Sequence, residues 1–169
     1  CIVSKMVMNP TADYVSPASN QILREGLTEY YALNPHVTPP ETQPAEFARI
    51  LLAHDVLHVI YGLDTGMYDE LKLLPLSWWT SESTFATYLK MKDSPAVDVM
   101  YADMIQEKGV LWLYGTVLKV LPTLIPALIP IWFKTRKRQK RLPFIEFEHF
   151  LDRCFLEIRQ ECDLLQCNK

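Results

Sequence analysis

Two histidines and two acids stand at a spacing that suits a metal ion. His54 and His58 are four residues apart, so on a helix their imidazoles lie on one face, one turn apart. Asp55 falls on the flank of that face, where its carboxylate can be either a ligand or an outer partner of a ligand. Glu70 follows His58 after eleven intervening residues and comes from the next element. Histidine pairs of this kind, completed by a carboxylate, form zinc and iron sites.

Other interpretations of the same residues are weaker. One histidine can simply pack while the other caps a chain end, but two of the chain's four histidines occur here, which favours a metal. An HD-type phosphohydrolase needs a further histidine on a facing helix, and His36 lies in a proline-rich loop. A protease of the HExxH type needs glutamate as general base at position 55, where this chain has aspartate.

Helices are expected to position the motif. The central one should begin near Pro44 and stop at Gly62, and because it is apolar nearly all round it should be buried. Glu70 should lie early in a second helix, from Gly66 or Met67 to Leu74, which Pro75 ends. Further helices are expected at about 21–33, 85–91, 96–108 and 143–165.

Composition bounds the fold and the partners. The 169 residues are 49% hydrophobic and 22% charged, which is ordinary for one globular domain spanning 1–169, with 1–20 as a loosely held arm. Few glycines and few alternating β-branched runs favour an all-α domain. The net charge of −3 gives no case for nucleic-acid binding. The four cysteines form no CxxC pair, so buried thiols and a reducing compartment are expected.

The segment 109–141 is predicted to associate with a membrane. Its first 25 residues hold one charge, Lys119, and six of the next eight are basic. An apolar segment beside a basic cluster suits an anionic membrane surface. Pro122, Pro126 and Pro130 argue against a simple transmembrane helix, which leaves an interfacial helix, a core helix and a true span as alternatives in that order.

The pattern HDxxH, eleven residues, then glutamate resembles the coenzyme Q biosynthesis protein four (Coq four) family. Phe147-Glu148 and the run from Ile158 to Glu161 are similar to its C-terminal helix. The resemblance implies an all-helical, membrane-peripheral protein of ubiquinone biosynthesis. It also implies that His54, Asp55, His58 and Glu70 hold a divalent metal, zinc in the family, and form the catalytic site.

That resemblance sets the expected function: decarboxylation, coupled to C1 hydroxylation, of a polyprenylated hydroxybenzoate. Zinc has no redox function, so oxygen chemistry would need iron, cobalt or manganese, and magnesium is a further candidate. The alternative is a non-catalytic scaffold that binds a prenyl lipid or quinone intermediate and organises other quinone-biosynthesis proteins. A homo-oligomer is expected, on the matrix face of the mitochondrial inner membrane or the cytoplasmic face of a bacterial membrane.

Overall fold

A computed structural model describes residues 12–37, 45–83, 86, 102, 105–136, 140–162 and 164. Within these ranges the chain is helical and has no strands, only two isolated bridges, which confirms the all-α expectation. The elements are the α-helices α1 (Leu23–Leu33), α2 (Ala45–Tyr61), α3 (Met67–Thr80), α6 (Val110–Thr135) and α7 (Phe155–Glu161), and the 3-10 turns η1 (Asp13–Val15) and η3 (Glu148–Phe150).

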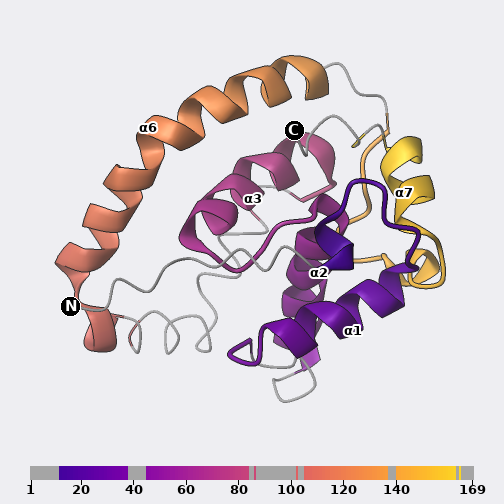
Figure 1. Cartoon of the computed structure of the whole chain (residues 1–169), viewed down its shortest axis with the longest axis horizontal. Coiled ribbons are helices and arrows are strands. Elements are labelled where there is room, and N and C mark those ends of the chain that lie inside the picture. Colours follow the sequence, from indigo (N-terminus) through magenta and orange to yellow (C-terminus); the bar gives the residue numbers. More distant parts are fainter. Residues whose placement is uncertain are drawn as a thin grey trace.

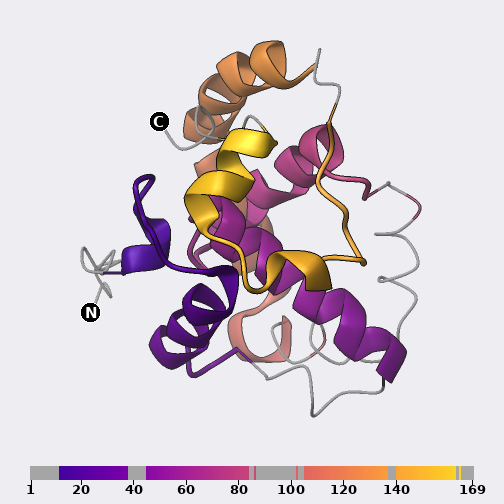
Figure 2. The ribbon, with the colours of Figure 1, turned by 90° about the vertical axis from the view of Figure 1, so that its right-hand side faces the viewer.

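Helix α2 occupies the centre of the described structure. Its second half is buried, as its nearly all-round apolar sequence predicted. Helices α1 and α7 lie against it, and α3 passes between it and α6 (Figures 1 and 2). Gly26 permits the close approach of α1: a Cβ there would stand 2.9 Å from Val59 Cγ1 and would overlap the Phe155 ring.

The predicted stop at Gly62 is confirmed and has an identifiable geometry. Gly62 adopts φ 64°, a conformation that glycine enters without penalty. Its N–H donates to Val59 O at 3.2 Å, and the Leu63 N–H donates to His58 O at 2.9 Å. These two bonds are those of a Schellman cap. The end of α2 is therefore fixed at the turn that carries His58.

Arg159 also contributes to this end of α2. It is fully buried, and the hydrogen bonds described for it go to main-chain carbonyls. Nε donates to Ile60 O at 2.8 Å, and the two Nη atoms donate to Ser16 O at 2.7 Å and Tyr14 O at 2.9 Å. A cation on the last carbonyls of a helix also opposes the negative end of its dipole.

The expectation of one helix over 143–165 is wrong. Helix α7 covers only Phe155–Glu161, and η3 precedes it. The intervening backbone bonds to the start of α1 instead: Leu23 N–H donates to Arg153 O at 3.0 Å, and Phe155 N–H donates to Gln21 O at 2.9 Å. Tertiary hydrogen bonds replace the helical ones here, which apolar spacing alone does not reveal.

Three other segments differ from the boundaries that the sequence predicted or can be compared with them only in part. Helix α3 runs through Pro75 to Thr80, because the last turns pack inward: Leu76, Ser77 and Thr80 are buried. Part of the expected arm is held in place, since the N–H groups of Asp13 and Tyr14 donate to the Glu29 carboxylate. The expected helix at 85–91 lies outside the described residues except for residue 86, and of the one at 96–108 the structure describes residues 102 and 105–108, which are helical.

Helix α6 is a single helix of 26 residues that arches along one side of the molecule, over α3 (Figure 1). It contains Pro122, Pro126 and Pro130 without a break. It is long and apolar enough to cross a membrane, and only 11% of its most apolar window is buried. One apolar helix is thus a candidate for membrane association, in the region where the sequence placed it.

Candidate functional site

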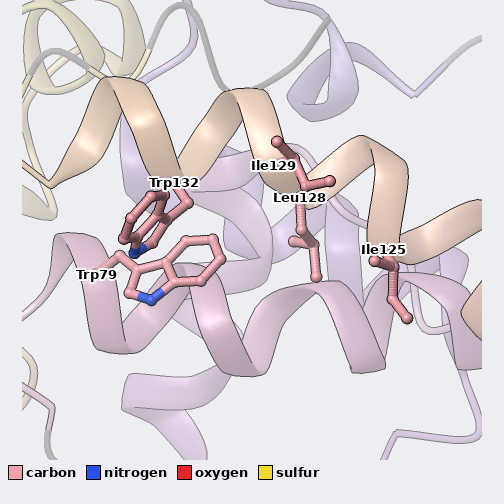
Figure 3. A pocket seen from close by; sticks show the side chains of 5 residues that line it. All are labelled: Trp79, Ile125, Leu128, Ile129 and Trp132. Atoms are coloured by element: carbon pink, nitrogen blue, oxygen red, sulfur yellow. The ribbon is translucent and has the colours of Figure 1, made fainter.

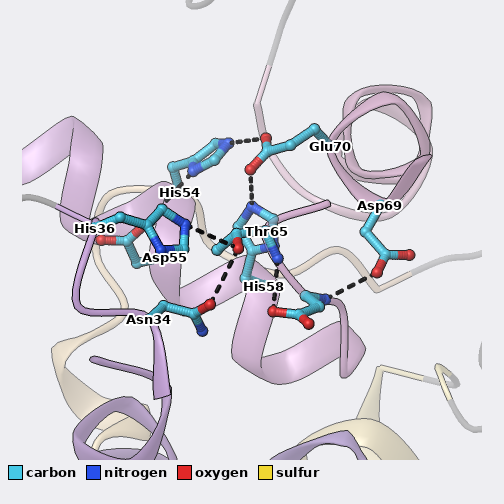
Figure 4. A network of polar contacts seen from close by, with 9 residues as sticks. Asn34, His36, His54, Asp55, His58, Thr65, Asp69 and Glu70 are labelled. Atoms are coloured by element: carbon cyan, nitrogen blue, oxygen red, sulfur yellow. Dashed lines mark hydrogen bonds and ion pairs between the residues drawn. The ribbon is translucent and has the colours of Figure 1, made fainter. Parts of the chain in front are cut away.

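The structure brings three of the four predicted site residues together. The ligand atoms of His54, His58 and Glu70 all lie within 4.8 Å of one another, so this group can hold a metal ion. Glu70 Oε2 lies 3.6 Å from His54 Nε2, and Oε1 lies 3.2 Å from His58 Nε2. Figure 4 shows the carboxylate pointing at both imidazoles, which are contributed by successive turns of α2.

Local structure explains why these side chains converge. The four-residue spacing places the two rings on one face of α2, edge to face and with centroids 4.8 Å apart. Glu70 belongs to the first turns of α3, where its N–H donates to Gly66 O at 2.9 Å. The connection is braced as well, because the Asp64 N–H donates to the Asp69 carboxylate at 3.1 Å.

His58 is the least satisfied member of the group. It is 0% exposed, and neither ring nitrogen has a hydrogen-bond partner in the part of the chain that is described. The 3.2 Å approach to Glu70 is close enough for an ion pair but lacks hydrogen-bond geometry. Tyr30 stacks on the ring at 5.7 Å between centroids and fixes its plane. A buried imidazole without partners is costly, and a metal ion would satisfy one of its nitrogens.

Asp55 lies beside the group and not within it. Its Oδ1 is 3.7 Å from His54 Nδ1, on the opposite side of that ring from Glu70. Its Oδ2 accepts a hydrogen bond of 2.7 Å from the Tyr31 hydroxyl. Of the two roles that the sequence left open for Asp55, this placement favours the outer one, in which it orients His54.

The ionisation states of His54 and Glu70 depend on each other. Burial lowers the pKa of His54, but the contacts with Asp55 and Glu70 outweigh it and raise that pKa from 6.5 to about 9. Burial raises the pKa of Glu70, but His54 and His58 outweigh it and lower that pKa from 4.5 to about 2. Without a metal, the group therefore holds a proton near neutral pH, and a bound cation would replace that proton.

Two tyrosines of α1, Tyr30 and Tyr31, complete the site and were missed from the sequence. Burial, followed by Asp55 and Glu70, raises the pKa of Tyr30 above its usual range, so its hydroxyl stays neutral. The preference of tyrosine for burial with a bonded hydroxyl was the available signal, but nothing local points it toward α2.

A groove of about 320 Å³ lies elsewhere, between α3 and α6. Trp79, Ile125, Leu128, Ile129 and Trp132 line it (Figure 3). These residues include none of the His54, His58 and Glu70 group. The groove is therefore a separate feature of the α6 side.

Comparison with known proteins corrects the family expectation. The family model that matches is Melittin, over residues 114–140, which covers most of α6 and the basic residues after it. No curated protein and no solved structure matches the chain. The predicted membership of the Coq four family is therefore wrong: a short motif with few fixed positions matches unrelated chains. The prenylated substrate, the quinone-biosynthesis partners and the homo-oligomer depended on that resemblance and stay predictions.

Proposed function

We propose that this chain is a membrane-peripheral metalloenzyme in which His54, His58 and Glu70 hold a divalent metal ion. The observation that carries the proposal is His58: a buried imidazole that has no hydrogen-bond partner among the described residues, lies 3.2 Å from a carboxylate and meets a second imidazole edge to face. Two imidazoles and one carboxylate are a common ligand set for zinc and for non-haem iron.

The donor set supports a catalytic rather than a purely structural ion. Three protein ligands leave at least one position of a tetrahedral ion open, whereas structural zinc sites are closed by four. The side chains of His54 and Glu70 are 22% and 38% exposed, so solvent and substrate can approach the ion from their side. When bound, the metal supplies Lewis-acid chemistry: it polarises a substrate oxygen or lowers the pKa of a water.

This chain's own residues have definable tasks in that chemistry. The Asp55 carboxylate lies beside Nδ1 of His54 and orients the ring, so that Nε2 faces the ion. The Tyr31 hydroxyl donates a hydrogen bond to Asp55 and orients that carboxylate in turn. Tyr30 covers the His58 ring and keeps water from that side. Glu70 supplies the negative charge that offsets a divalent cation. The predicted catalytic roles of His54, Asp55, His58 and Glu70 are thus retained, with Asp55 as a positioning residue.

An amphiphilic substrate with an acidic oxygen fits a metal centre in a protein that carries an exposed apolar helix. Decarboxylation of a prenylated aromatic acid stays a prediction within this class. The competing proposal is a scaffold with a structural metal, and it requires a fourth ligand that closes the coordination sphere.

The first experiment measures bound metal in the purified full-length chain after loading with zinc, iron(II) or cobalt(II). One ion per chain is expected, and it should be lost in His58→Ala and in Glu70→Gln. His149→Ala is the matched control, because His149 is an exposed histidine of η3 and should leave the metal content unchanged. Absence of metal from the loaded wild-type chain would overturn the proposal.

The second experiment separates the enzyme from the scaffold. The cobalt(II)-loaded chain is titrated with azide, and its visible absorption is recorded. A spectral change in the wild type shows an open coordination position, and release of carbon dioxide from a short-chain prenylated hydroxybenzoate under air then tests the predicted reaction. An unchanged spectrum together with no turnover would support the scaffold with a structural metal.

A further inference from the structure

Helix α6 turns an apolar face away from the protein. Its inward side carries the buried residues Leu124, Ile131 and Thr135. The opposite side carries exposed apolar residues, with Leu111 89% and Leu118 67% exposed. This outer stripe consists of Leu111, Leu118, Ile125, Ile129 and Phe133; Ile125 and Ile129 stand at its border, because they also line the groove beside Trp79. Steps of seven and four residues keep it on one face along nearly the whole helix, so the stripe is continuous.

Both ends of α6 combine an aromatic ring with a cation. At the start, Lys108 Nζ lies 4.9 Å from the centre of the Trp112 ring. At the end, the Arg136 guanidinium lies 5.2 Å from the Trp132 ring centre and 4.7 Å from that of Phe133. Aromatic rings beside basic side chains are typical of the boundary between headgroups and acyl chains. The cations complement an anionic surface, together with the other basic residues of 134–141 except Lys140, which pairs with Glu161.

The prolines decide between a helix that lies in this boundary and one that crosses the bilayer. Pro122, Pro126 and Pro130 have no N–H, so the carbonyls of Leu118, Pro122 and Pro126 lack their helical donors. These three residues are exposed. An unbonded carbonyl in hydrocarbon costs several kcal/mol, whereas water and headgroups at the interface can donate to it. The exposed Lys119 near the middle of the helix points to the same location.

The neighbour of α6 gives an independent argument. The inner side of α6 packs along α3, whose first turns carry Asp69, Glu70 and Lys72. A crossing α6 would bring this charged helix into the hydrocarbon. Figures 1 and 3 show α3 running along one side of α6. A helix that lies flat with its opposite side in the membrane leaves α3 in water.

We propose that α6 lies in the plane of an anionic membrane surface, with the outer stripe inserted between the lipids. Basic and aromatic side chains at both ends hold it at the headgroup level. The partner of the outer stripe is therefore the lipid bilayer. This inference rests on the membrane-peripheral part of the proposed function and does not depend on whether the metal group binds a metal.

Vesicle binding of the full-length chain tests the proposal. Binding to phosphatidylcholine vesicles should be weak, and adding phosphatidylglycerol should strengthen it in a manner that high salt reverses. Leu111→Glu and Leu118→Glu, at stripe residues outside the groove, should each weaken binding about tenfold or more, because a carboxylate would enter the apolar boundary. Leu33→Glu is the matched control: it replaces an exposed leucine of α1 and should bind like the wild type. His58→Ala should also bind normally, which keeps this test separate from that of the metal.

Depth measurements test the orientation. A fluorophore is attached to Leu111→Cys, Leu121→Cys or Phe133→Cys, and quenching by lipids brominated at different depths is compared. Labels at 111 and 133 should report similar shallow depths, and the label at 121 should be no deeper than the acyl boundary. A label at 121 at the bilayer centre would show a crossing helix and overturn the proposal. Absence of vesicle binding, with self-association that Leu118→Glu abolishes, would overturn it in favour of a second copy of this chain.

Discussion

At the scale of single residues, His58 and Asp55 have different roles in the site: His58 is a candidate ligand, and Asp55 orients the ligand His54. His58 is enclosed by Tyr30 and by its own helix, so its position is set before any ion arrives. Asp55 has a partner on each side, His54 at 3.7 Å and the Tyr31 hydroxyl at 2.7 Å. Such an outer carboxylate fixes ring orientation and raises the basicity of the ligand.

Asp55→Asn should therefore weaken metal binding without abolishing it. A loss of about 10- to 100-fold in zinc affinity is expected, the range typical of outer partners of metal-bound histidines. Competition with a chromophoric chelator measures it. Tyr31→Phe, which removes only the hydrogen bond to Asp55, should give a smaller loss in the same direction. Zinc affinity that is unchanged in Asp55→Asn would contradict the role of Asp55 as a positioning residue.

At the scale of elements, Gly26 reverses the usual rule for helices. Glycine inside a helix is less favourable than alanine by about 1 kcal/mol, so Gly26→Ala would ordinarily stabilise α1. Here the new methyl group would overlap the Phe155 ring and press on Val59. We expect a net destabilisation of about 1–3 kcal/mol from this overpacking. Urea unfolding measures it, and Gly115→Ala in α6, where a Cβ meets nothing within 4 Å, is the control.

Arg159 should be the most sensitive position of α7. Its guanidinium donates hydrogen bonds to carbonyls of α2 and of the segment around η1. Arg159→Leu therefore leaves several buried acceptors without donors. A loss of about 3 kcal/mol or more in the free energy of unfolding is expected. Arg159→Lys should not restore it, because an ammonium cannot reproduce the planar fork of donors. Restoration by lysine, measured by thermal unfolding, would show that charge alone suffices.

The sequence predicted the helices well where their boundaries depend on residues within or next to the helix itself. The ends of α2, the start of α3 near Met67 and the apolar helix over 110–135 agree with periodicity and caps. The prediction of one helix over 143–165 failed, because this segment pairs its backbone with Gln21 and Leu23. The burial of Arg159 is likewise a tertiary event, and nothing in the sequence indicated it. Likewise, the spacing of His54 and His58 predicted the metal group, whereas Tyr30 and Tyr31 come from a distant helix.

At the scale of the whole molecule, the charged group links stability to pH. The pKa of His54 rises from 6.5 to about 9 on folding, so its contribution is complete below pH 6.5 and is lost as the pH rises through 9. The pKa of Glu70 falls from 4.5 to about 2, so its contribution is complete above pH 4.5 and is lost as the pH falls through 2. Without metal, the joint contribution is therefore greatest between about pH 4.5 and 6.5.

Thermal unfolding of the metal-free chain should thus show a Tm that decreases from pH 6.5 to pH 9. Zinc should oppose this decrease, because it binds the neutral imidazole and its stabilisation grows as the proton leaves His54. His54→Gln should flatten the decrease in the metal-free protein and remove most of the effect of zinc. The same slope in wild type and variant would show that other groups set the pH dependence.

Pairing between the segment around Cys154 and the start of α1 also bears on how the chain acquires its structure. The Ile22–Cys154 bridge and the Arg159 bonds to the carbonyls of Val59 and Ile60 join positions about a hundred residues or more apart. Contacts of such sequence separation form late and slow folding. On the ribosome, helix α2 would emerge long before the guanidinium that completes its end. Helix α2 thus acquires this cation only after α7 has been synthesised, and until then the nascent chain exposes apolar surface of α2, which favours aggregation.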